Sequence, residues 1–310
     1  MPHASRPEIE RALRFIAAQL TQPITAADVA RAAHLSEFHL HRVFHAEVGE
    51  SIGRFITRRR LELAALRLAY EPDRSITDIA LSSGYSSSSN FSKAFAGFFG
   101  VNPRSVRERQ AGMSPRVGKL MAQYGKPFEP DDLYTCLPTQ EPSERAREAA
   151  TWNAAVRFET VDTLPFACLA STDGYDYATL ETTWNTLIDR ARQLGLCQED
   201  VDAWGIAHDS PQLTAPELCR YHASVPCPPG TVLPAPLFAG ERSAGRYAVF
   251  HYSGAVSGVA DAYRSIYSCW FPEASIAPDN YEPLDHYITD APKDGQVTLE
   301  LWFKTRTRRD

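Results

Sequence analysis

The sequence predicts a two-domain protein, in which an all-α domain with two helix-turn-helix motifs precedes an α+β domain made of two strand-helix-strand-strand repeats. One pattern is written twice, at residues 24–44 and 76–95: a short Ala-containing helix, a turn, a Ser that can cap a helix, and a second helix. Strand and helix periodicities then alternate twice between residues 154 and 310, after a stretch rich in Gly and Pro. We therefore expect domains at 1–110 and 154–310, joined by a linker at 111–153.

Charge is divided unevenly along the chain. The 310 residues carry a formal net charge of −6, but residues 1–112 hold 15 Lys and Arg against 11 Asp and Glu, whereas the remainder holds 17 against 27. A basic first third beside an acidic remainder is typical of a nucleic-acid-binding domain joined to a domain with another role.

Composition also indicates the cellular compartment and argues against metal chemistry. No apolar run approaches the length of a membrane span, and no secretory leader follows Met1. The six cysteines form no CxxC pair, which favours a reduced, cytoplasmic setting and argues against a zinc site. His41 and His45 have the i, i+4 spacing of metal ligands, but no Cys or carboxylate completes a set beside them. We therefore expect neither a metal nor another cofactor.

The first helix-turn-helix motif follows an opening helix at residues 7–20. Thr25 and Asp28 have the spacing of a capping box, and Ser36 can cap the second helix. That second helix has two faces at helical spacing, one that packs and one that presents rings and hydrogen-bond donors. The packing face holds Leu40, Val43 and Phe44 with Glu47, and the presented face holds Phe38, His41, Arg42 and His45. A second helix of this kind is the part of the motif that enters a DNA major groove.

The second motif repeats this arrangement after a long connecting helix at residues 51–70. Gly84 permits a turn that needs positive φ, and Ser87 is the expected cap. The predicted buried stripe is Phe91, Ala94, Phe95 and Phe98, and the predicted exposed stripe is Ser88, Ser89, Ser92 and Lys93. Phosphate contacts are expected from five arginines, which alternatively lie on solvated helix faces: Arg58, Arg59, Arg60, Arg104 and Arg107.

This region resembles the DNA-binding domain of the AraC/XylS family of transcriptional regulators. The most specific match is the run Asp78-Ile-Ala-Leu-Ser-Ser-Gly-Tyr-Ser-Ser-Ser-Ser-Asn-Phe-Ser-Lys-Ala-Phe, followed by Phe99-Gly-Val-Asn-Pro-Arg. The resemblance covers roughly the first third of the chain. It implies that bases are contacted by Phe38, His41 and Arg42 in the first motif and by Ser88, Ser89, Ser92 and Lys93 in the second. Relatives often carry Gln where this chain has Ser88-Ser89-Asn90, so the base preference of the second motif stays open.

From about Ala154 the expected elements form two similar units. Each repeat consists of a strand region, a helix and two further strands. In the first repeat the strand region is 155–159 with 166–170, the helix is 180–194, and the further strands are 203–208 and 219–225. In the second repeat the strand is 245–252, the helix is 256–270, and the further strands are 281–287 and 296–304. Two such units can join edge to edge and leave a concave groove, where ligands commonly bind.

The second domain is rich in Trp and Tyr, whose faces attract cations by about 0.5–2 kcal/mol per good contact. A carboxylate in an apolar groove gains from a cationic partner, because an unpaired buried charge is costly. Glu300 shares its strand face with Trp302 and is the first candidate for that carboxylate, the alternative being a Glu300 that faces solvent; Glu282 is the second candidate. Further candidate effector contacts, in a domain where most aromatic residues belong to the core, are Tyr252, Tyr263 and Tyr287.

This half resembles the GyrI-like small-molecule-binding domain, which occurs at the C-terminus of some AraC-family regulators. The doubled unit and the closing strand Thr298-Leu-Glu-Leu-Trp-Phe carry the resemblance, over about half of the chain. It implies a pocket that is rich in aromatic residues, has an acidic residue at its base, and binds hydrophobic, often cationic, molecules.

Two functions follow from these patterns. The first is a sequence-specific DNA-binding transcriptional regulator without enzymatic activity, whose partners are double-stranded promoter DNA, a small-molecule effector and, as a further candidate, RNA polymerase. The second is a small-molecule hydrolase, since some stand-alone GyrI-like proteins hydrolyse reactive electrophiles. In a hydrolase, Glu300 would act as a general base and would need a raised pKa in its aromatic surroundings.

Overall fold

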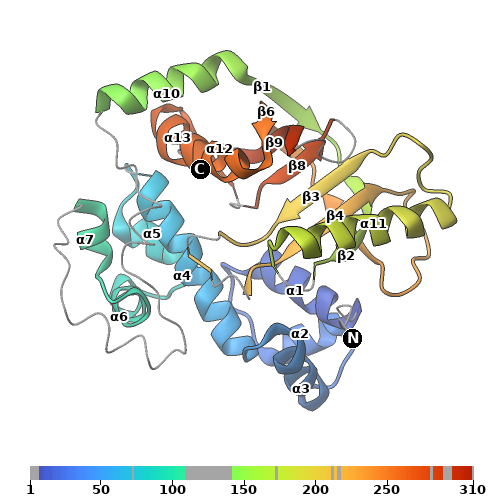
Figure 1. Cartoon of the computed structure of the whole chain (residues 1–310). Helices are drawn as coiled ribbons and strands as arrows, with labels where there is room; N and C mark the ends of the chain where they lie inside the picture. Colours follow the sequence, from blue (N-terminus) through green and yellow to red (C-terminus); the bar gives the residue numbers. More distant parts are fainter. Residues whose placement is uncertain are drawn as a thin grey trace. The chain divides into compact units, whose positions relative to one another are not determined.

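The chain forms two compact units, Glu8–Thr139 and Gln140–Asp310 (Figure 1). The computed structural model describes residues 7–71, 73–108, 142–171, 174–210, 213–214, 218–279, 282–288 and 295–308. The first unit is helical, and the second combines a β-sheet with helices. This division agrees with the predicted order of an all-α domain and an α+β domain.

Five helices of the first unit, α2 to α6, begin at side-chain caps. Thr25, Ser36, Ser51, Ser75 and Ser87 each accept a hydrogen bond from the backbone N–H three residues later, and the reciprocal capping box of Thr25 and Asp28 is formed as predicted. The described helices are α1 (Pro7–Gln19), α2 (Ala26–Ala33), α3 (Glu37–Val48), α4 (Ile52–Tyr70), α5 (Ile76–Ser82), α6 (Ser88–Phe99) and α7 (Pro103–Glu108).

Both helix-turn-helix motifs turn in the same way. Gly84 has φ 85°, as predicted, and His34 holds the equivalent place in the first motif with φ 58°. The residue after each turn donates its N–H back to the preceding helix, Leu35 to Ala30 O at 2.9 Å and Tyr85 to Ala80 O at 3.1 Å. Gly84 is needed for a second reason, because a Cβ there would lie 2.8 Å from Arg60 Nε.

The cores of this unit lie under the predicted stripes. In the first half, α1 to α4 bury a cluster that includes Ile9, Ile16, Leu40, Phe44 and Phe55. In the second half, three Phe rings of α6 are fully or almost fully buried and contact one another along the helix: Phe91, Phe95 and Phe99. Phe98, which was predicted to be buried, is half-buried, and Phe99 takes its place in the core. Because these stripes pack inward, the opposite faces of α3 and α6 point outward.

The second unit is built on an antiparallel sheet with the strand order β1-β6-β9-β8-β3-β4-β2-β5, and β7 pairs separately with β9. The strands are β1 (Val156–Val161), β2 (Leu164–Ala170), β3 (Ala203–Ala207), β4 (Tyr221–Pro226), β5 (Phe238–Arg242), β6 (Gly245–Ala255), β7 (Ile276–Pro278), β8 (Leu284–Tyr287) and β9 (Gln296–Thr307). The sequence did not predict β5 and β7.

Helices cover one face of this sheet in two groups. α11 (Tyr177–Gln193) packs on β2 and β4 around Leu187 and Ala223. The second group packs on β6 and β9 around Phe250 and Leu301. It consists of α10 (Pro142–Ala155), the 3-10 turn η2 (Val256–Gly258), α12 (Val259–Ser265), the π-helical turn η3 (Ile266–Trp270) and α13 (Phe271–Glu273).

The opposite face of the sheet has a core of its own, made from strand residues such as Phe166, Trp204, Val249 and Trp302. The alternation along β9 sorts its side chains between the two faces: Leu299, Leu301 and Phe303 lie under the helices, and Trp302 lies in the opposite core. We call these the helix-covered face and the strand-core face.

The linker prediction needs one correction. Residues 142–153 lie in α10, which packs on the helical group of the second unit, so these residues belong to that unit. The indole of Trp152 contacts the ring of Phe250 with centroids 5.7 Å apart, an apolar contact that composition alone did not reveal. Residues 111–141 of the predicted linker lie outside the described residues. Among the described helices, none is long and apolar enough to cross a membrane.

Candidate functional site

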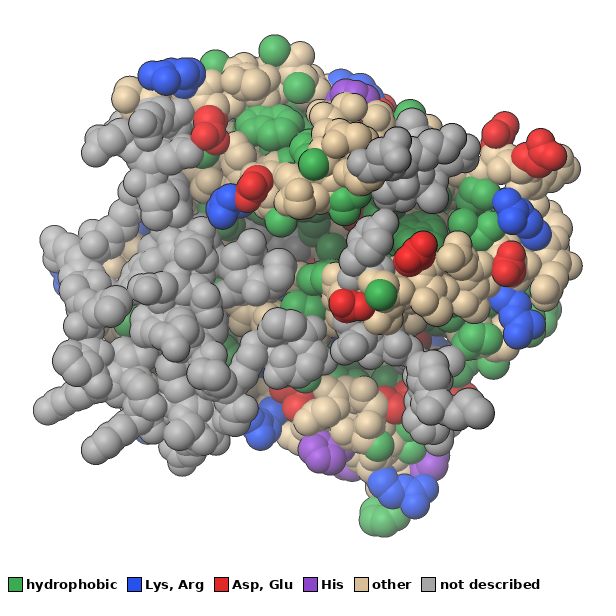
Figure 2. Space-filling view, viewed as in Figure 1, with side chains coloured by type: hydrophobic (Ala, Val, Ile, Leu, Met, Phe, Trp, Pro, Cys, Tyr) green, Lys and Arg blue, Asp and Glu red, His purple; other side chains and the backbone are tan. Residues whose placement is uncertain are grey.

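The outward face of α3 carries four of the predicted DNA-contacting residues. Phe38 is 82 % exposed, and His41, Arg42 and His45 are exposed beside it. The lower tip of the molecule in Figure 2, where α3 lies, shows apolar, basic and histidine side chains close together. Leaving a Phe ring in water forgoes about 1.5–3 kcal/mol of burial, so this face gains from a partner that covers it.

The outward face of α6 is smaller and more polar. Ser89 and Lys93 are exposed, and Ser88 and Ser92 are half-buried. The side chains are short apart from Lys93, so the face presents hydroxyl groups close to the backbone and one mobile positive charge.

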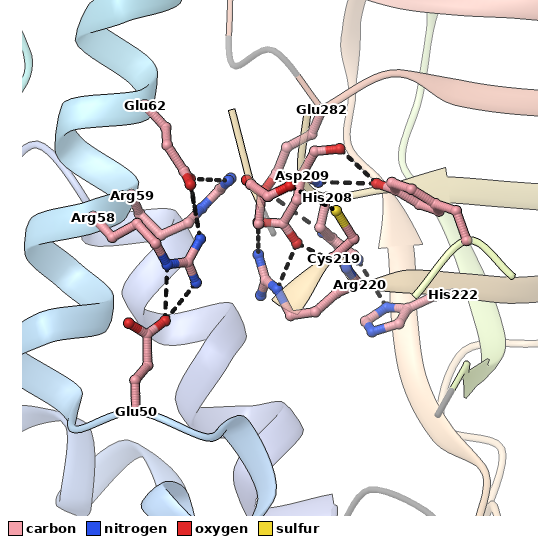
Figure 3. Close-up of polar contacts among 12 residues, drawn as sticks. Glu50, Arg58, Arg59, Glu62, His208, Asp209, Cys219, Arg220, His222 and Glu282 are labelled. Carbon is pink, nitrogen blue, oxygen red and sulfur yellow. Dashed lines mark hydrogen bonds and ion pairs between the residues drawn. The ribbon is translucent and has the colours of Figure 1, made fainter. Parts of the chain in front are cut away.

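Arg58 is not on a solvated face. It is 6 % exposed, and its guanidinium donates to Glu50 Oε1 at 2.9 Å and to Glu62 Oε1 at 3.0 Å (Figure 3). Arg59 also contacts Glu62, at 3.1 Å, with 13 % of its side chain exposed. The prediction that Arg58 contacts phosphate is wrong, because a guanidinium buried between two carboxylates is already neutralised. Arg59 is largely committed to the same network.

Two further predicted phosphate ligands support the helical unit from inside. Arg60 donates to Leu20 O at 2.7 Å and to Gln22 O at 2.6 Å, beyond the end of α1. Arg107 donates to Arg74 O at 2.8 Å. These side chains satisfy backbone carbonyls that a helix end or loop leaves unpaired. Of the five predicted arginines, Arg104 is the one that the structure leaves exposed.

Glu300 and Trp302 share a strand face as predicted, but it is the strand-core face. Trp302 is 4 % exposed, and its Nε1 donates to Glu300 Oε2 at 3.1 Å. Arg157 contacts both carboxylate oxygens of Glu300 at 2.8 Å, and His286 Nδ1 lies 3.4 Å away. The carboxylate of Glu300 therefore already has a cationic partner in Arg157, and its role as the effector carboxylate stays a prediction.

This environment also removes the basis for general-base chemistry at Glu300. Burial alone would raise the pKa of Glu300. The hydrogen bonds and charge of Arg157, with the hydrogen bonds of Trp302 and His286, outweigh burial and hold the pKa below its ordinary value of 4.5. The hydrolase alternative required a raised pKa at this residue.

Asp285 is the buried carboxylate of the helix-covered face, and the sequence analysis missed it. It pairs across the sheet with Gly205 of β3 and Leu301 of β9, between the α11 group and the α12 group. It is 6 % exposed, and Tyr263 donates to its Oδ1 at 2.5 Å. Burial raises the pKa of Asp285 to about 6, although the Tyr263 hydrogen bond opposes the shift.

Aromatic rings surround this carboxylate, and we call the set of Asp285, Tyr263, Tyr287, Tyr221 and Trp184 the Asp285 cluster. The hydroxyls of Tyr221 and Tyr287 are 3.0 Å apart, and Trp184 lies edge-on to Tyr287 with centroids 5.3 Å apart. Tyr263, Tyr287 and Trp184 are each partly exposed, whereas Tyr221 is buried. The cluster thus combines three partly exposed aromatic residues with one buried acid.

Gly205 shapes the floor of the Asp285 cluster. A Cβ at this position would overlap the hydroxyl of Tyr221, which crosses β3 to reach Tyr287. The strand that separates Asp285 from the α11 group therefore has no side chain at this point, and the Tyr221 phenol takes that space.

The remaining predicted effector residues lie beside the cluster. The Tyr252 ring packs in the α12 group, and its hydroxyl donates to Ala255 O at 2.7 Å. Glu282 Oε1 lies 3.5 Å from His208 Nδ1, and His208 Nε2 lies 2.9 Å from His222 Nδ1 (Figure 3). Burial, and then the neighbouring His222, lower the pKa of His208 to about 4. His208 is therefore neutral at physiological pH.

Asp209 forms a separate polar contact in the same view. Its side chain has no exposed area and accepts from Arg220 Nε at 2.9 Å and from the Arg220 backbone N–H at 2.9 Å. Within the described ranges no three His, Cys, Asp or Glu side chains come together as metal ligands.

Comparisons with known proteins match two parts of the chain separately. Residues 29–109 match the model of a helix-turn-helix domain, and residues 154–306 match that of the GyrI-like small molecule binding domain. The regulatory protein SoxS of Salmonella typhimurium is 34% identical over 33% of this chain and 94% of its own length. The chain belongs to the AraC family of transcriptional regulators.

Other transcriptional regulators match about a third of this chain. The uncharacterized HTH-type transcriptional regulator YbfP of Bacillus subtilis is 33% identical over 32% of this chain, and the match spans 33% of YbfP. A crystal structure of a transcriptional regulator from Chromobacterium violaceum, with an AraC-type DNA-binding domain, is 27% identical with a TM-score of 0.32, over 35% of this chain and 96% of its own. The helix-turn-helix match, residues 29–109, contains α3 and α6, and the GyrI-like match, residues 154–306, contains the Asp285 cluster.

Proposed function

We propose that this AraC-family chain binds DNA sequence-specifically by placing α3 and α6 in successive major grooves. Both helices are the second helix of a helix-turn-helix motif, and both have an outward polar face over a buried apolar stripe. Successive major grooves on one side of B-form DNA lie about 34 Å apart. The single chain carries two recognition helices, so one molecule is sufficient for one site.

The two helices differ in what they can recognise. On α3, the Arg42 guanidinium suits the O6 and N7 acceptors of guanine, and the exposed ring of Phe38 suits the methyl group of thymine. On α6, Ser88, Ser89 and Ser92 offer hydroxyls that accept or donate to several bases. We therefore assign most of the base discrimination to α3, and to Lys93 mainly a phosphate or single-acceptor contact.

The second unit binds a hydrophobic, cationic small molecule at the Asp285 cluster in this proposal. The observation that carries it is the state of Asp285: 6 % exposed, held by one hydrogen bond from Tyr263, and surrounded by partly exposed rings. Among the described residues, none donates to its second oxygen and no Lys or Arg is paired with it. Glu300, Asp209 and Glu62 each have an arginine partner.

The energetics favour a cation at Asp285. A buried, unpaired carboxylate is costly, and at neutral pH Asp285 is mostly ionised even with its pKa raised to about 6. A cationic ligand removes that cost by pairing with it. Each ring that faces the ligand adds roughly 0.5–2 kcal/mol of cation–π attraction, and the apolar body of the ligand gains burial besides.

Together these assignments describe a ligand-responsive transcriptional regulator. Its partners are double-stranded promoter DNA and a small hydrophobic cation, with RNA polymerase as a further candidate. We interpret the second unit as two repeats, β2-α11-β3-β4 and β6-helix-β8-β9. The effector site lies where these two repeats join.

The effector proposal is tested by titrating tetraphenylphosphonium into the full-length protein, with binding measured by calorimetry. Asp285→Asn should weaken binding at least about tenfold, because it removes the charge and keeps the shape. Glu300→Gln, on the opposite face, is the matched control and should bind like the natural chain. Equal loss in both variants, or none in Asp285→Asn, would remove Asp285 from the site.

The DNA proposal is tested by selecting bound fragments from a random duplex pool with the full-length protein. The selected sites should contain two conserved blocks with centres about 10 base pairs apart, one for each helix. A single block, or enrichment without sequence preference, would contradict the assignment of two recognition helices.

A further inference from the structure

The helical run from Val256 to Glu273 lies between the Asp285 cluster and α10. It passes from a 3-10 turn through α12 into the π-helical turn η3 and then α13 without leaving the helical path. Figure 1 shows α10, α12 and α13 lying close together over the sheet. α10 is also the first described element that follows α7 along the chain, so it leads from the DNA-binding domain into the second unit.

One side of this run carries a member of the effector site. Tyr263, near the end of α12, donates its hydroxyl to Asp285 Oδ1 at 2.5 Å. Tyr267, one turn later in η3, packs against Phe303 with ring centroids 5.1 Å apart. A ligand that takes the Asp285 carboxylate must displace or share the Tyr263 hydroxyl, so its binding acts directly on this helix.

The other side of the run is hydrogen-bonded to α10. Trp152 Nε1 donates to Ser265 Oγ at 2.9 Å, and Ser265 Oγ donates to Glu148 Oε2 at 2.6 Å. Trp270 Nε1 donates to Asn153 Oδ1 at 2.8 Å. Ser265 is two residues from Tyr263, so the effector site and the α10 contacts are separated by less than one helical turn.

The π-helical turn gives this run an irregular backbone at the same point. Phe271 donates its N–H to Ile266 O, five residues back, where an α-helix would use the residue four back. Pro272 follows and has no N–H to continue the regular pattern. Single π-turns inside helices are rare and occur frequently at functional sites.

We propose that the occupancy of Asp285 is transmitted through Tyr263, the π-helical turn and Ser265 to α10, and from there to the chain that joins the DNA-binding domain. This inference rests on the proposed function, since it assigns a regulation to the same site. Loss of the Tyr263–Asp285 hydrogen bond shifts the run, and the shift changes the contacts of Trp152 and Glu148. The packed run then has two arrangements, which the ligand and α10 favour to different degrees.

The test uses the full-length chain without ligand and measures backbone hydrogen exchange by mass spectrometry. Tyr263→Phe removes the hydroxyl that bonds Asp285, and Tyr247→Phe is the matched control, because its hydroxyl donates to Ser243 O at 2.8 Å on the strand-core side. In Tyr263→Phe the amides of residues 142–155 should exchange at least about threefold faster than in the natural chain. In Tyr247→Phe they should be unchanged.

A second variant, Ser265→Ala, tests whether the effect of Tyr263→Phe reaches α10 through the hydrogen bonds of Ser265. In a Ser265→Ala background, the added effect of Tyr263→Phe on α10 should shrink to less than about half, because the hydrogen-bonded connection is already cut. Unchanged α10 exchange in Tyr263→Phe, or equal changes in both tyrosine variants, would overturn the inference. Failure of tetraphenylphosphonium to bind would instead sink the proposed effector site, so the two failures are distinguishable.

Discussion

Replacing Asp285 by Asn should stabilise the second unit at neutral pH. In the natural chain, burial raises the pKa of Asp285 from 3.8 to about 6. The folded state therefore binds a proton that the unfolded state releases between these two values. Stability contributed by this group is present at low pH and is lost as pH rises through about 6, which is the reverse of the usual carboxylate behaviour.

The magnitude follows from the difference in pKa. The interval between 3.8 and about 6 corresponds to about 3 kcal/mol at pH 7.5. The Asn side chain keeps an acceptor for the Tyr263 hydroxyl and carries no charge, so it avoids this cost. Between pH 7.5 and pH 4.5 the natural Asp recovers most of its protonation, and the stability advantage of the Asp285→Asn variant over the natural chain should shrink by about 2 kcal/mol.

Urea unfolding followed by tryptophan fluorescence measures this directly. The five tryptophans all belong to the second unit: Trp152, Trp184, Trp204, Trp270 and Trp302. The signal therefore reports the unfolding of that unit and not of the helical one. The unfolding free energy of each protein is determined at pH 7.5 and 4.5, and the variant-minus-natural difference cancels the titration of all other groups.

Glu300→Gln is the control with the opposite sign. Arg157 holds the pKa of Glu300 below its ordinary value, so this group stabilises the fold above its unfolded-state pKa and loses that contribution as pH falls. Glu300→Gln should therefore destabilise at pH 7.5 and less so at low pH. If Asp285→Asn is destabilising at pH 7.5, or its effect does not change with pH, Asp285 is not an uncompensated buried acid and the reasoning fails.

Three further predictions concern DNA recognition by Arg42, the stability contributed by Arg58 and the effect of Glu300 on ligand affinity. Arg42→Ala should cost about 1–3 kcal/mol of specific DNA binding and relax preference at one base pair, measured on a panel of single-base site variants; an unaltered preference profile would show that Arg42 reads no base. Arg58→Ala should destabilise the helical unit by about 3–5 kcal/mol in thermal unfolding followed by circular dichroism, because the buried Glu50 loses its arginine and Glu62 loses one of its two; a loss below about 1 kcal/mol would favour a surface role. Glu300→Gln should leave tetraphenylphosphonium affinity within about twofold of the natural chain, and a larger loss would return Glu300 to the binding site.

The sequence was sufficient for the helical unit because its signals are local. Caps such as Ser36 and Ser87, and the turn glycine Gly84, act within four residues of their partners, so spacing alone reveals them. The prediction that Arg58 of α4 contacts phosphate failed for the opposite reason, because its two partners are not both local in the sequence. Glu62 is four residues from Arg58 and was a visible clue, but Glu50 comes from before the helix, and only the fold brings both carboxylates to one guanidinium.

Our proposal places the effector site at Asp285 and not at the predicted Glu300, because strand alternation alone does not say which face of the sheet a residue is on. Glu300 and Trp302 alternate in the same way as Asp285 and Tyr287, and both pairs were visible as an acid two residues from an aromatic ring. The partner that decides the case, Arg157, lies 143 residues from Glu300 in the sequence. No local pattern in the sequence says which face of β8 or β9 the helices cover. The aromatic composition therefore predicted a pocket for a cation, but the sequence alone could not choose between the carboxylates of Glu300 and Asp285.

The coupling of the two domains through one carboxylate is tested most directly by one measurement: the affinity of the full-length protein for a selected DNA site, by fluorescence anisotropy, with and without saturating tetraphenylphosphonium. In the natural chain the cation should shift the dissociation constant by roughly 5- to 150-fold, the usual range of coupling between two sites. In Asp285→Asn the same concentration should produce no shift. An unaltered dissociation constant in the natural chain despite bound cation, or an equal shift in Asp285→Asn, would contradict the coupling of the two domains through Asp285.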